Sequence, residues 1–535
     1  MANFEILIFI LFIVVLVTAV AENINIPYPI LLVITGMLVG FIPNLPNWQP
    51  PNNLILPIFL PPILFSAART ISWHDIKNYP LTIFSLAFVL VYLTMLVVAA
   101  TLYFFIPEMK WNIALLLGAI VSPTDVIASL SILGGLQVKT EIIRVIKVES
   151  LFNDAAAVFF YKMALIMVIS ASNSHNNAHP WHPGIILMGI LIGFSFAFIA
   201  NTIIKYFLTS SENDLAIILG IVLAYISYLF AQEIEASGVI AVVTAGLFYK
   251  KATHRIRATT RLAEKAVWDS LLFFLNGLIF ISIGVELPNY FKQTSHLSTS
   301  MIFLISILTI LTMMTLRFFW ILLTNFVTLY FKNKKNQTIE NFDNLWKNTA
   351  VTTWAGLRGL VSITIALALP TTLENGQPFY ERSLIIIVTI VVILFTLVGQ
   401  GLSLPLVIKI LNVRKKDDTD KHRIQEVYQL LNKKALRRLS TFIHHPETPS
   451  EEARRLVEDH YSSKLLFPES LTYDPESQKK QIKAQQQADL LLARSLQYQR
   501  DALLRLYGRG EISEEIYLKV LNKLDKDEVS FTQHS

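Results

Sequence analysis

The sequence contains no cysteine and few charged residues, and both shortages restrict what the chain can be. Without cysteine there are no disulfides, no thiolate metal ligands and no cysteine nucleophile. Only 16% of the 535 residues are charged, against about a quarter in soluble proteins, whereas 53% are hydrophobic and the mean hydropathy is +0.51. This composition predicts an all-α protein that crosses a membrane many times.

Thirteen apolar runs are long enough, or nearly so with flanking anchors, to cross about 30 Å of hydrocarbon. The first run has Glu5 as its only preceding charge and lacks the basic start of a signal peptide, so we predict a retained helix with its N-terminus outside. The runs lie near residues 4–20, 28–42, 54–68, 81–106, 111–133, 145–170, 184–208, 214–231, 237–250, 267–287, 299–330, 349–370 and 383–411.

Basic residues are distributed unevenly among the loops between these runs. With the N-terminus outside, the inner loops carry fifteen lysines and arginines and the outer loops carry three. This positive-inside pattern places the C-terminal region in the cytoplasm, and it explains the formal charge of +6 without a nucleic-acid partner. The inner residues are Arg69, Lys77, Lys139, Arg144, Lys205, Lys250, Lys251, Arg255, Arg257, Arg261, Lys265, Lys332, Lys334, Lys335 and Lys347, and the outer ones are Lys110, Lys292 and Arg382.

The composition changes from apolar to charged and polar at Asn412. We therefore predict a transmembrane domain over residues 1–411 and a cytoplasmic helical region over 412–535, because apolar residues recur there at helical spacing. A compact helical domain and a loosely ordered tail with interaction helices are both compatible with this pattern.

The order of the apolar runs predicts an inverted repeat. If the seventh run is a linker, the first six and the last six runs form two halves of opposite orientation, as in secondary transporters. The fifth run then corresponds to the twelfth, and both contain residues that disturb a helix.

In the fifth run Pro123 interrupts the helix and is followed directly by Thr124 and Asp125. Non-helical backbone at membrane depth persists only where it lines a cavity or is buried in protein. Hydroxyl, carboxylate and freed carbonyl oxygens are ligands for a hard monovalent cation, so the fifth run predicts part of an ion site. A simple proline kink is the alternative.

In the twelfth run Arg358 lies between Gly356 and Gly359. A guanidinium inside the membrane costs about 3 kcal/mol or more unless it is paired. We therefore expect a carboxylate partner for Arg358; the alternative is that its side chain snorkels to the interface.

The run 145–170 contains two carboxylates on different faces of the predicted helix. Ser150, Asn153 and Asp154 are spaced i, i+3, i+4 and share one face, whereas Glu149 is rotated by about 100° from Ser150. Glu149 could pair with Arg358, while Asp154 faces an ion path. A carboxyl group removed from water can hold either a proton or a cation, because desolvation disfavours its bare charge. A purely structural polar network is the alternative.

Six segments resemble the monovalent cation:proton antiporter family, in its sodium/proton exchanger branch. They are FLPPILFSAA (59–68), GAIVSPTDVIA (118–128), ESLFNDAAAV (149–158), SGVIAVVTAGL (237–247), FFLNGLIFISIGVEL (273–287) and GLRGLVSITIALAL (356–369). The resemblance covers roughly residues 1–411, and its specificity comes from the order and spacing of the segments.

This resemblance implies thirteen helices, with a core domain built around two crossing discontinuous helices and a separate dimerisation domain. It implies that Asp154 binds the cation or the proton, that Asn153, Ser150 and Thr124 surround it, and that Asp125 is the acid of the unwound helix. Asn153 in place of a second acid is similar to the electroneutral branch, in which one carboxylate carries one charge in either direction.

The resemblance also implies that Glu149 and Arg358 form a structural ion pair between the two repeats. Three positions depart from the family pattern. Ser66 stands where many relatives have an acid, Val126 follows Asp125 where many have proline, and Lys162 lies eight residues after Asp154. We expect Lys162 to be a snorkelling or network residue.

The expected function is exchange of Na⁺, or of K⁺ or Li⁺, for H⁺ by a homodimer in the lipid of a bacterial plasma membrane, without a cofactor and without enzymatic activity. One alternative is an intramembrane aspartyl protease that uses Asp125 and Asp154. Another is an uncoupled channel or sensor with the same fold. His175, His179 and His182 share one outer loop and could bind a metal, but we interpret them as solvated loop residues.

Overall fold

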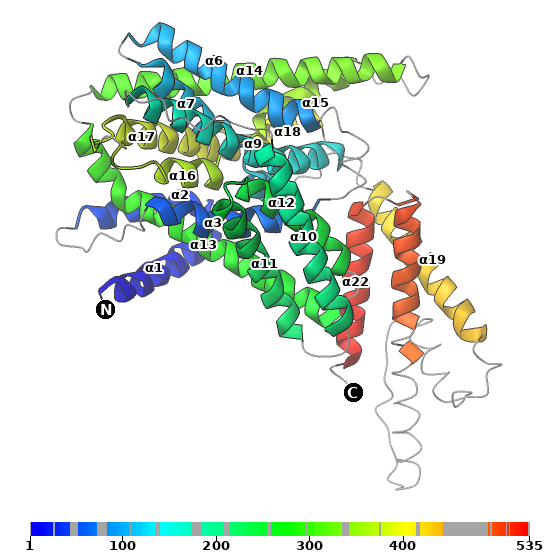
Figure 1. Cartoon of the computed structure of the whole chain (residues 1–535). Coiled ribbons are helices and arrows are strands. Elements are labelled where there is room, and N and C mark those ends of the chain that lie inside the picture. Colours follow the sequence, from blue (N-terminus) through cyan, green and yellow to red (C-terminus); the bar gives the residue numbers. More distant parts are fainter. Residues whose placement is uncertain are drawn as a thin grey trace. The chain divides into compact units, whose positions relative to one another are not determined.

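The structure, a computed structural model, shows a chain of helices with no β-strand in the part that it describes (Figure 1). His175, His179 and His182 lie outside the described residues. The described residues are 2–24, 27–42, 52–71, 83–107, 109–133, 138, 140–172, 184–207, 213–253, 258–294, 298–333, 342–373, 376–413, 418–441, 491–492, 495–509, 511–512 and 514–532.

The chain divides into two compact units. The first comprises Met1–Arg255 and Ala266–Lys415, and the second comprises Ile256–Lys265 and Lys416–Ser535. The long helix α13 (Ala258–Gln293) therefore begins in the second unit and continues in the first.

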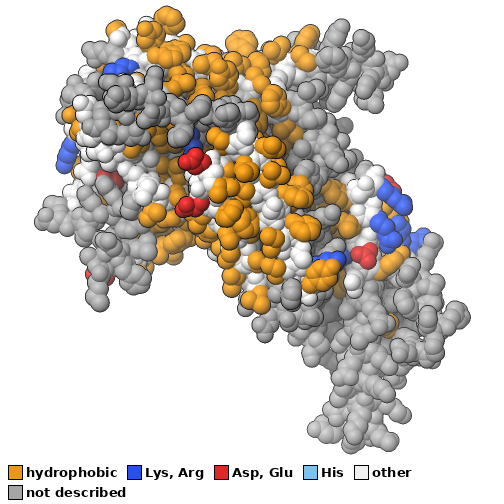
Figure 2. All heavy atoms as spheres, in the orientation of Figure 1, with side chains coloured by type: hydrophobic (Ala, Val, Ile, Leu, Met, Phe, Trp, Pro, Cys, Tyr) orange, Lys and Arg blue, Asp and Glu red, His pale blue; other side chains and the backbone are white. Residues whose placement is uncertain are grey.

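Every predicted apolar run coincides with one, two or three consecutive helices of the first unit. The apolar side chains that these helices expose spread over the visible face of that unit (Figure 2), as expected for a protein surrounded by lipid. The helices besides α13 are α1 (Ala2–Ile24), α2 (Tyr28–Gly40), α3 (Asn52–Arg69), η1 (Ser85–Val89), α6 (Leu90–Phe105), α7 (Trp111–Val121), α8 (Val126–Leu133), α9 (Thr140–Ser172), α10 (Gly184–Phe207), α11 (Asn213–Glu233), α12 (Gly238–Thr253), α14 (Thr299–Asn333), α15 (Phe342–Trp354), α16 (Leu360–Leu367), α17 (Glu381–Leu394), η2 (Phe395–Gln400) and α18 (Gly401–Leu411).

Seven helical segments in the described part of the chain are long and apolar enough to cross a membrane. Four shorter apolar helices accompany them, at Ile8–Ala21, Tyr28–Gly40, Trp111–Val121 and Gly238–Tyr249. The chain is thus a multi-pass membrane protein, whereas the number of thirteen crossings stays a prediction. The seven segments are Ser85–Phe105, Val145–Ala171, Gly184–Tyr206, Leu215–Glu233, Thr260–Gln293, Thr299–Val327 and Glu381–Leu411.

Glycines permit close packing between α2 and α13. A Cβ atom added to Gly36 would lie 2.9 Å from the Cα atom of Gly284, and one added to Gly284 would lie 2.8 Å from the Cα atom of Gly36. The two backbones can approach this closely only without side chains, which is the usual basis of helix association in lipid.

Most of the other helices of the first unit pack in two groups. In one group, α3, α10, α11 and α12 pack chiefly on each other, and Figure 1 shows α10, α11 and α12 running together. In the other, α9 packs on α6, α7, α8 and η1, while α14 packs on α6, α15 and α17. α9 touches α3 and α12 more sparsely, so it lies at the boundary between the two groups.

The described residues of the second unit share a hydrophobic core, while the extent of a domain over 412–535 stays a prediction. α19 (Asp418–Thr441), the helical residues 495–508 and α22 (Glu514–Thr532) bury Leu431, Leu503 and Leu524 against one another. The buried carboxylate of Asp525 binds Arg261, from the first turn of α13, and Arg500.

Candidate ion-binding site

Two interrupted helices meet in the first unit. Non-helical residues around Pro123 separate α7 from α8, and a second break separates α15 from α16. The breaks satisfy each other's polar groups: the Asp125 N–H donates to the Leu357 carbonyl at 2.7 Å, and Nη1 of Arg358 donates to the Ser122 carbonyl at 2.6 Å. These contacts satisfy backbone groups in place of the missing helical hydrogen bonds, as burial at membrane depth requires.

The Asp125 carboxylate lies at the start of both half-helices that follow the breaks. Its Oδ1 atom accepts the Ala128 N–H at 3.1 Å and caps α8. At the start of α16, a Cβ atom on Gly359 would collide with the same carboxylate, so the two groups are in contact. A negative charge there complements the positive ends of both helix dipoles.

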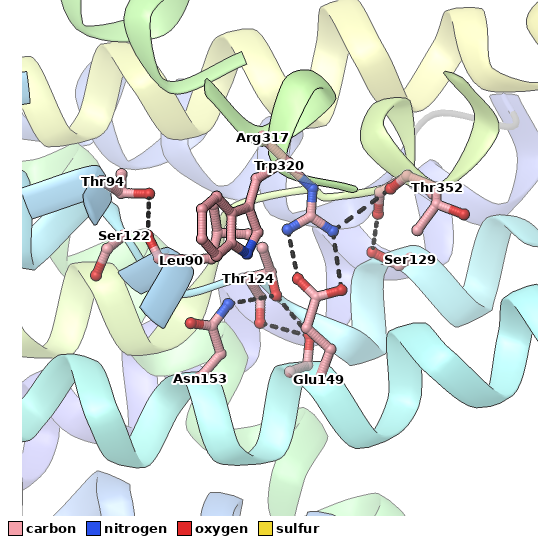
Figure 3. A network of polar contacts seen from close by, with 12 residues as sticks. Leu90, Thr94, Ser122, Thr124, Ser129, Glu149, Asn153, Arg317, Trp320 and Thr352 are labelled. Carbon is pink, nitrogen blue, oxygen red and sulfur yellow. Dashed lines mark hydrogen bonds and ion pairs between the residues drawn. The ribbon is translucent and has the colours of Figure 1, made fainter. Parts of the chain in front are cut away.

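Three of the predicted site residues form one hydrogen-bonded cluster, of which Figure 3 labels Thr124 and Asn153. The Ser150 hydroxyl donates to the Thr124 carbonyl at 2.8 Å and lies 2.9 Å from the Thr124 hydroxyl. The Asn153 amide donates to the Thr124 hydroxyl at 3.3 Å. These hydrogen bonds hold α9 against the break after α7. The amide nitrogen of Asn153 is the donor in one of them.

Two acceptor oxygens next to this cluster have no hydrogen-bond partner among the residues that the structure describes. Asn153 and Asp154 are 1% and 6% exposed, and the Oδ1 atom of each is buried without a donor. A buried oxygen without a partner is costly, and each such atom in a folded protein needs an explanation. A carboxylate and an amide oxygen on adjacent residues can serve as ligands for a hard cation, and the carboxylate can alternatively take a proton.

Glu149 binds Arg317 of α14, and the expected direct pair with Arg358 does not form (Figure 3). Both carboxylate oxygens of Glu149 accept from the Arg317 guanidinium, and the distance from Nη2 to Oε2 is 3.1 Å. Gly356 makes room for this pair, because a Cβ atom there would lie 2.7 Å from the guanidinium carbon of Arg317. Gly356, two residues before Arg358 in the chain, therefore accommodates Arg317.

Arg358 is buried, and its contacts among the described residues include no ion pair with a carboxylate. Its guanidinium binds the Ser122 carbonyl and lies 3.0 Å from the sulfur of Met313, and the backbone N–H of Arg358 donates to the Thr396 hydroxyl at 3.1 Å. It does not snorkel, since only 2% of the residue is exposed. Sequence reasoning overlooked Arg317, although a lone arginine in the middle of the apolar run 299–330 was a signal that it needs a carboxylate.

The positions that depart from the family pattern lie on three helices. Ser66 is half-buried on α3, and Val126 is the first residue of α8, directly after the break. Lys162 is half-buried on α9, and its Nζ atom donates to Oε1 of Gln232 on α11 at 3.4 Å. Lys162 thus has a polar neighbour within the protein.

The model of one protein family, described as sodium/hydrogen exchanger, transmembrane, matches residues 8–410. The chain belongs to this family. The resemblance found in its six segments is confirmed. Because the family is one of transporters, the protease alternative has no support.

Relatives and solved structures agree with this assignment. The chain is 30% identical over 393 residues to the sodium, potassium, lithium and rubidium/H(+) antiporter of Bacillus subtilis, covering 71% of this chain and 58% of that relative. It is 30% identical over 394 residues to the Na(+)/H(+) antiporter ApNhaP of Aphanothece halophytica, covering 72% of this chain and 70% of that one. The chain therefore spans less than two thirds of the length of the Bacillus relative.

The fold is similar to that of the sodium proton antiporter MjNhaP1 of Methanocaldococcus jannaschii. The match has a TM-score of 0.58 at 21% identity and covers 76% of this chain and 98% of the other. An all-helical antiporter-like fold is therefore established for the membrane unit.

Proposed function

We propose that this protein is a secondary transporter that exchanges Na⁺ for H⁺ across the membrane, with K⁺ and Li⁺ as further candidate substrates. The observation that carries the proposal is the pair of buried, unpartnered oxygens on Asn153 and Asp154 beside the crossing of two interrupted helices. Further support comes from membership of the exchanger family and from the cations in the name of the Bacillus relative.

Exchange follows from competition for one carboxylate. Asp154 holds either a cation or a proton. The Asn153 oxygen can add a ligand to the cation, and it can accept a hydrogen bond from the protonated carboxyl of Asp154. Thr124 and Ser150 hold the break after α7 against α9 and thereby position both oxygens. One carboxylate carries one charge in either direction, so the exchange is electroneutral.

The interrupted helices support the proposed architecture of thirteen crossings in two inverted six-helix halves. The break after α7 falls in the fifth predicted run and the break after α15 in the twelfth, which are the corresponding runs of such a repeat. Asp125 acts in this scheme as the fixed charge between the half-helices.

The topology that we propose has the N-terminus outside and residues 412–535 in the cytoplasm, in the plasma membrane of a bacterium. It rests on the excess of basic residues in the inner loops. We propose further that residues 1–411 form the transport domain and that two copies assemble as a dimer in the lipid bilayer.

Exchange is tested with purified protein in vesicles that contain a pH-sensitive dye. Adding NaCl, KCl or LiCl outside acid-loaded vesicles should raise the internal pH, while choline chloride should not. An imposed membrane potential should leave the rate unchanged, whereas a channel would respond to it. Dependence on the potential without stoichiometric countermovement would refute the exchanger.

The site is tested with Asp154→Asn, which keeps the shape of the side chain and removes its charge. Exchange should fall to the level of empty vesicles while the protein still inserts. Asp269→Asn makes the same chemical change at an exposed position of α13 and should exchange like the wild type. Retained exchange in Asp154→Asn would refute the role of Asp154.

A further inference from the structure

Lys162 is a charged residue on the helix that carries Asp154, and the proposed exchange does not use it. It follows Asp154 by eight residues, which is about 12 Å along α9, and it lies within the membrane-crossing segment Val145–Ala171. Charged side chains within such segments are rare and by default functional. Its position therefore calls for an explanation.

The contacts of Lys162 leave it incompletely satisfied. Its ammonium has three donors, yet the described residues offer one acceptor, Oε1 of Gln232, at the long distance of 3.4 Å. No carboxylate in the described part of the chain lies within ion-pair distance of it. The other end of the Gln232 amide, Nε2, is buried and has no hydrogen-bond partner among the described residues. Both members of the pair can thus form better hydrogen bonds than they do here.

The pair joins helices that otherwise have little contact. Gln232 is on α11, which packs on α3, α10 and α12, whereas Lys162 is on α9, which packs on α6, α7 and α8. Gly238 leaves room for the amide, since a Cβ atom there would lie 3.1 Å from Nε2 of Gln232. The contact therefore bridges the boundary between the helix that holds the ion site and the neighbouring group of helices.

We propose that Lys162 and Gln232 form a polar latch between α9 and α11 that must open and close in every transport cycle. The proposal rests on the exchange function, because an exchanger must turn its site toward each side of the membrane in turn. Such movement shifts one group of helices against another around the site. A single long hydrogen bond to a neutral amide is easily broken, whereas a buried ion pair at the same place would resist separation.

The first test strengthens the latch with Gln232→Glu. The ammonium then faces a carboxylate, and exchange should slow about tenfold or more because a charge-assisted bond must break in each cycle. The Na⁺ concentration that gives half-maximal exchange should change by a much smaller factor than the maximal rate does. Adding Lys162→Gln to this variant removes the ion pair and should restore most of the rate. Glu233→Gln, an exposed change on the same turn of α11, is the matched control.

The second test closes the latch reversibly. The chain has no cysteine, so Lys162→Cys with Gln232→Cys gives the only two thiols. Bridging them with a short, reducible bis-methanethiosulfonate should stop exchange, and reduction should restore it, which shows that the bridged protein was folded.

The outcomes separate the latch from the exchange function. Full exchange by the bridged protein, or by Gln232→Glu, would overturn the latch while leaving exchange intact. A change in half-saturation by Na⁺ in Lys162→Gln, with the maximal rate unchanged and the bridge tolerated, would also overturn it. Absence of exchange in the wild type would instead refute the proposed function itself.

Discussion

Replacing Arg317 should be among the most destabilising changes in the membrane unit. The Arg317 and Glu149 side chains are 2% and 1% exposed, and the guanidinium binds both carboxylate oxygens. Arg317→Met keeps most of the side-chain volume but leaves Glu149 as a buried charge without its partner. Breaking a buried pair in this way costs about 3–5 kcal/mol, which lowers the ratio of folded to unfolded protein at least a hundredfold.

A double-mutant cycle separates the pair from other effects of the substitution. Glu149→Gln combined with Arg317→Met leaves no bare charge, so the double variant should be more stable than Arg317→Met alone by about 2 kcal/mol or more. The exposed pair between Lys110 and Glu381, at 3.0 Å with side chains 71% and 31% exposed, provides the control. Lys110→Gln should cost less than about 1 kcal/mol, because water replaces the lost partner.

The assay is thermal unfolding of the purified variants in detergent, together with the yield of folded protein from the membrane. Arg317→Met should lose most of its yield and melt well below the wild type, whereas the double variant should recover. If Arg317→Met melts like the wild type, or if the double variant is as unstable as the two single effects added together, the pair does not stabilise the fold.

Two further predictions concern the crossing and the second unit. Gly359→Ala places a methyl group against the Asp125 carboxylate and should cost about 1–3 kcal/mol and slow vesicle exchange, while Gly184→Ala, which meets no atom within 4 Å, should do neither. Asp525→Asn weakens the bonds to the two arginines that bind it, so limited proteolysis of the second unit should become faster, while Asp501→Asn at an exposed position leaves the rate unchanged.

The interruption of the fifth run could be predicted because its cause is local. Pro123 lacks an N–H and crowds the preceding turn, which favours a kink or a break at this point. The proline alone did not decide between the two, because α3 continues through Pro57, Pro61 and Pro62. The shared face of Ser150 and Asn153 is equally local, since residues three apart on a helix lie on one side. In the structure both side chains form hydrogen bonds with Thr124, which lies in the break after α7. Their spacing of three residues permits this because it places both on the same side of α9.

The partner of Glu149 could not be predicted from local sequence. Two arginines in apolar runs were available, and the choice between them depends on which helix lies beside α9 and how far its side chain reaches. Arg358 instead binds the Ser122 carbonyl, which the break leaves available. Sequence periodicity carries no information on such distances, because the paired residues are 168 and 236 positions apart in the chain.

The sequence alone determined that the chain is a multi-pass helical membrane protein of the exchanger family, because hydropathy and ordered motifs are properties of the linear chain. Only the tertiary structure decided which charges pair, which oxygens of Asn153 and Asp154 stay free, and that Lys162 reaches Gln232. The physical reason is that pairing and desolvation depend on distances across helix interfaces, which exist only after the helices have packed.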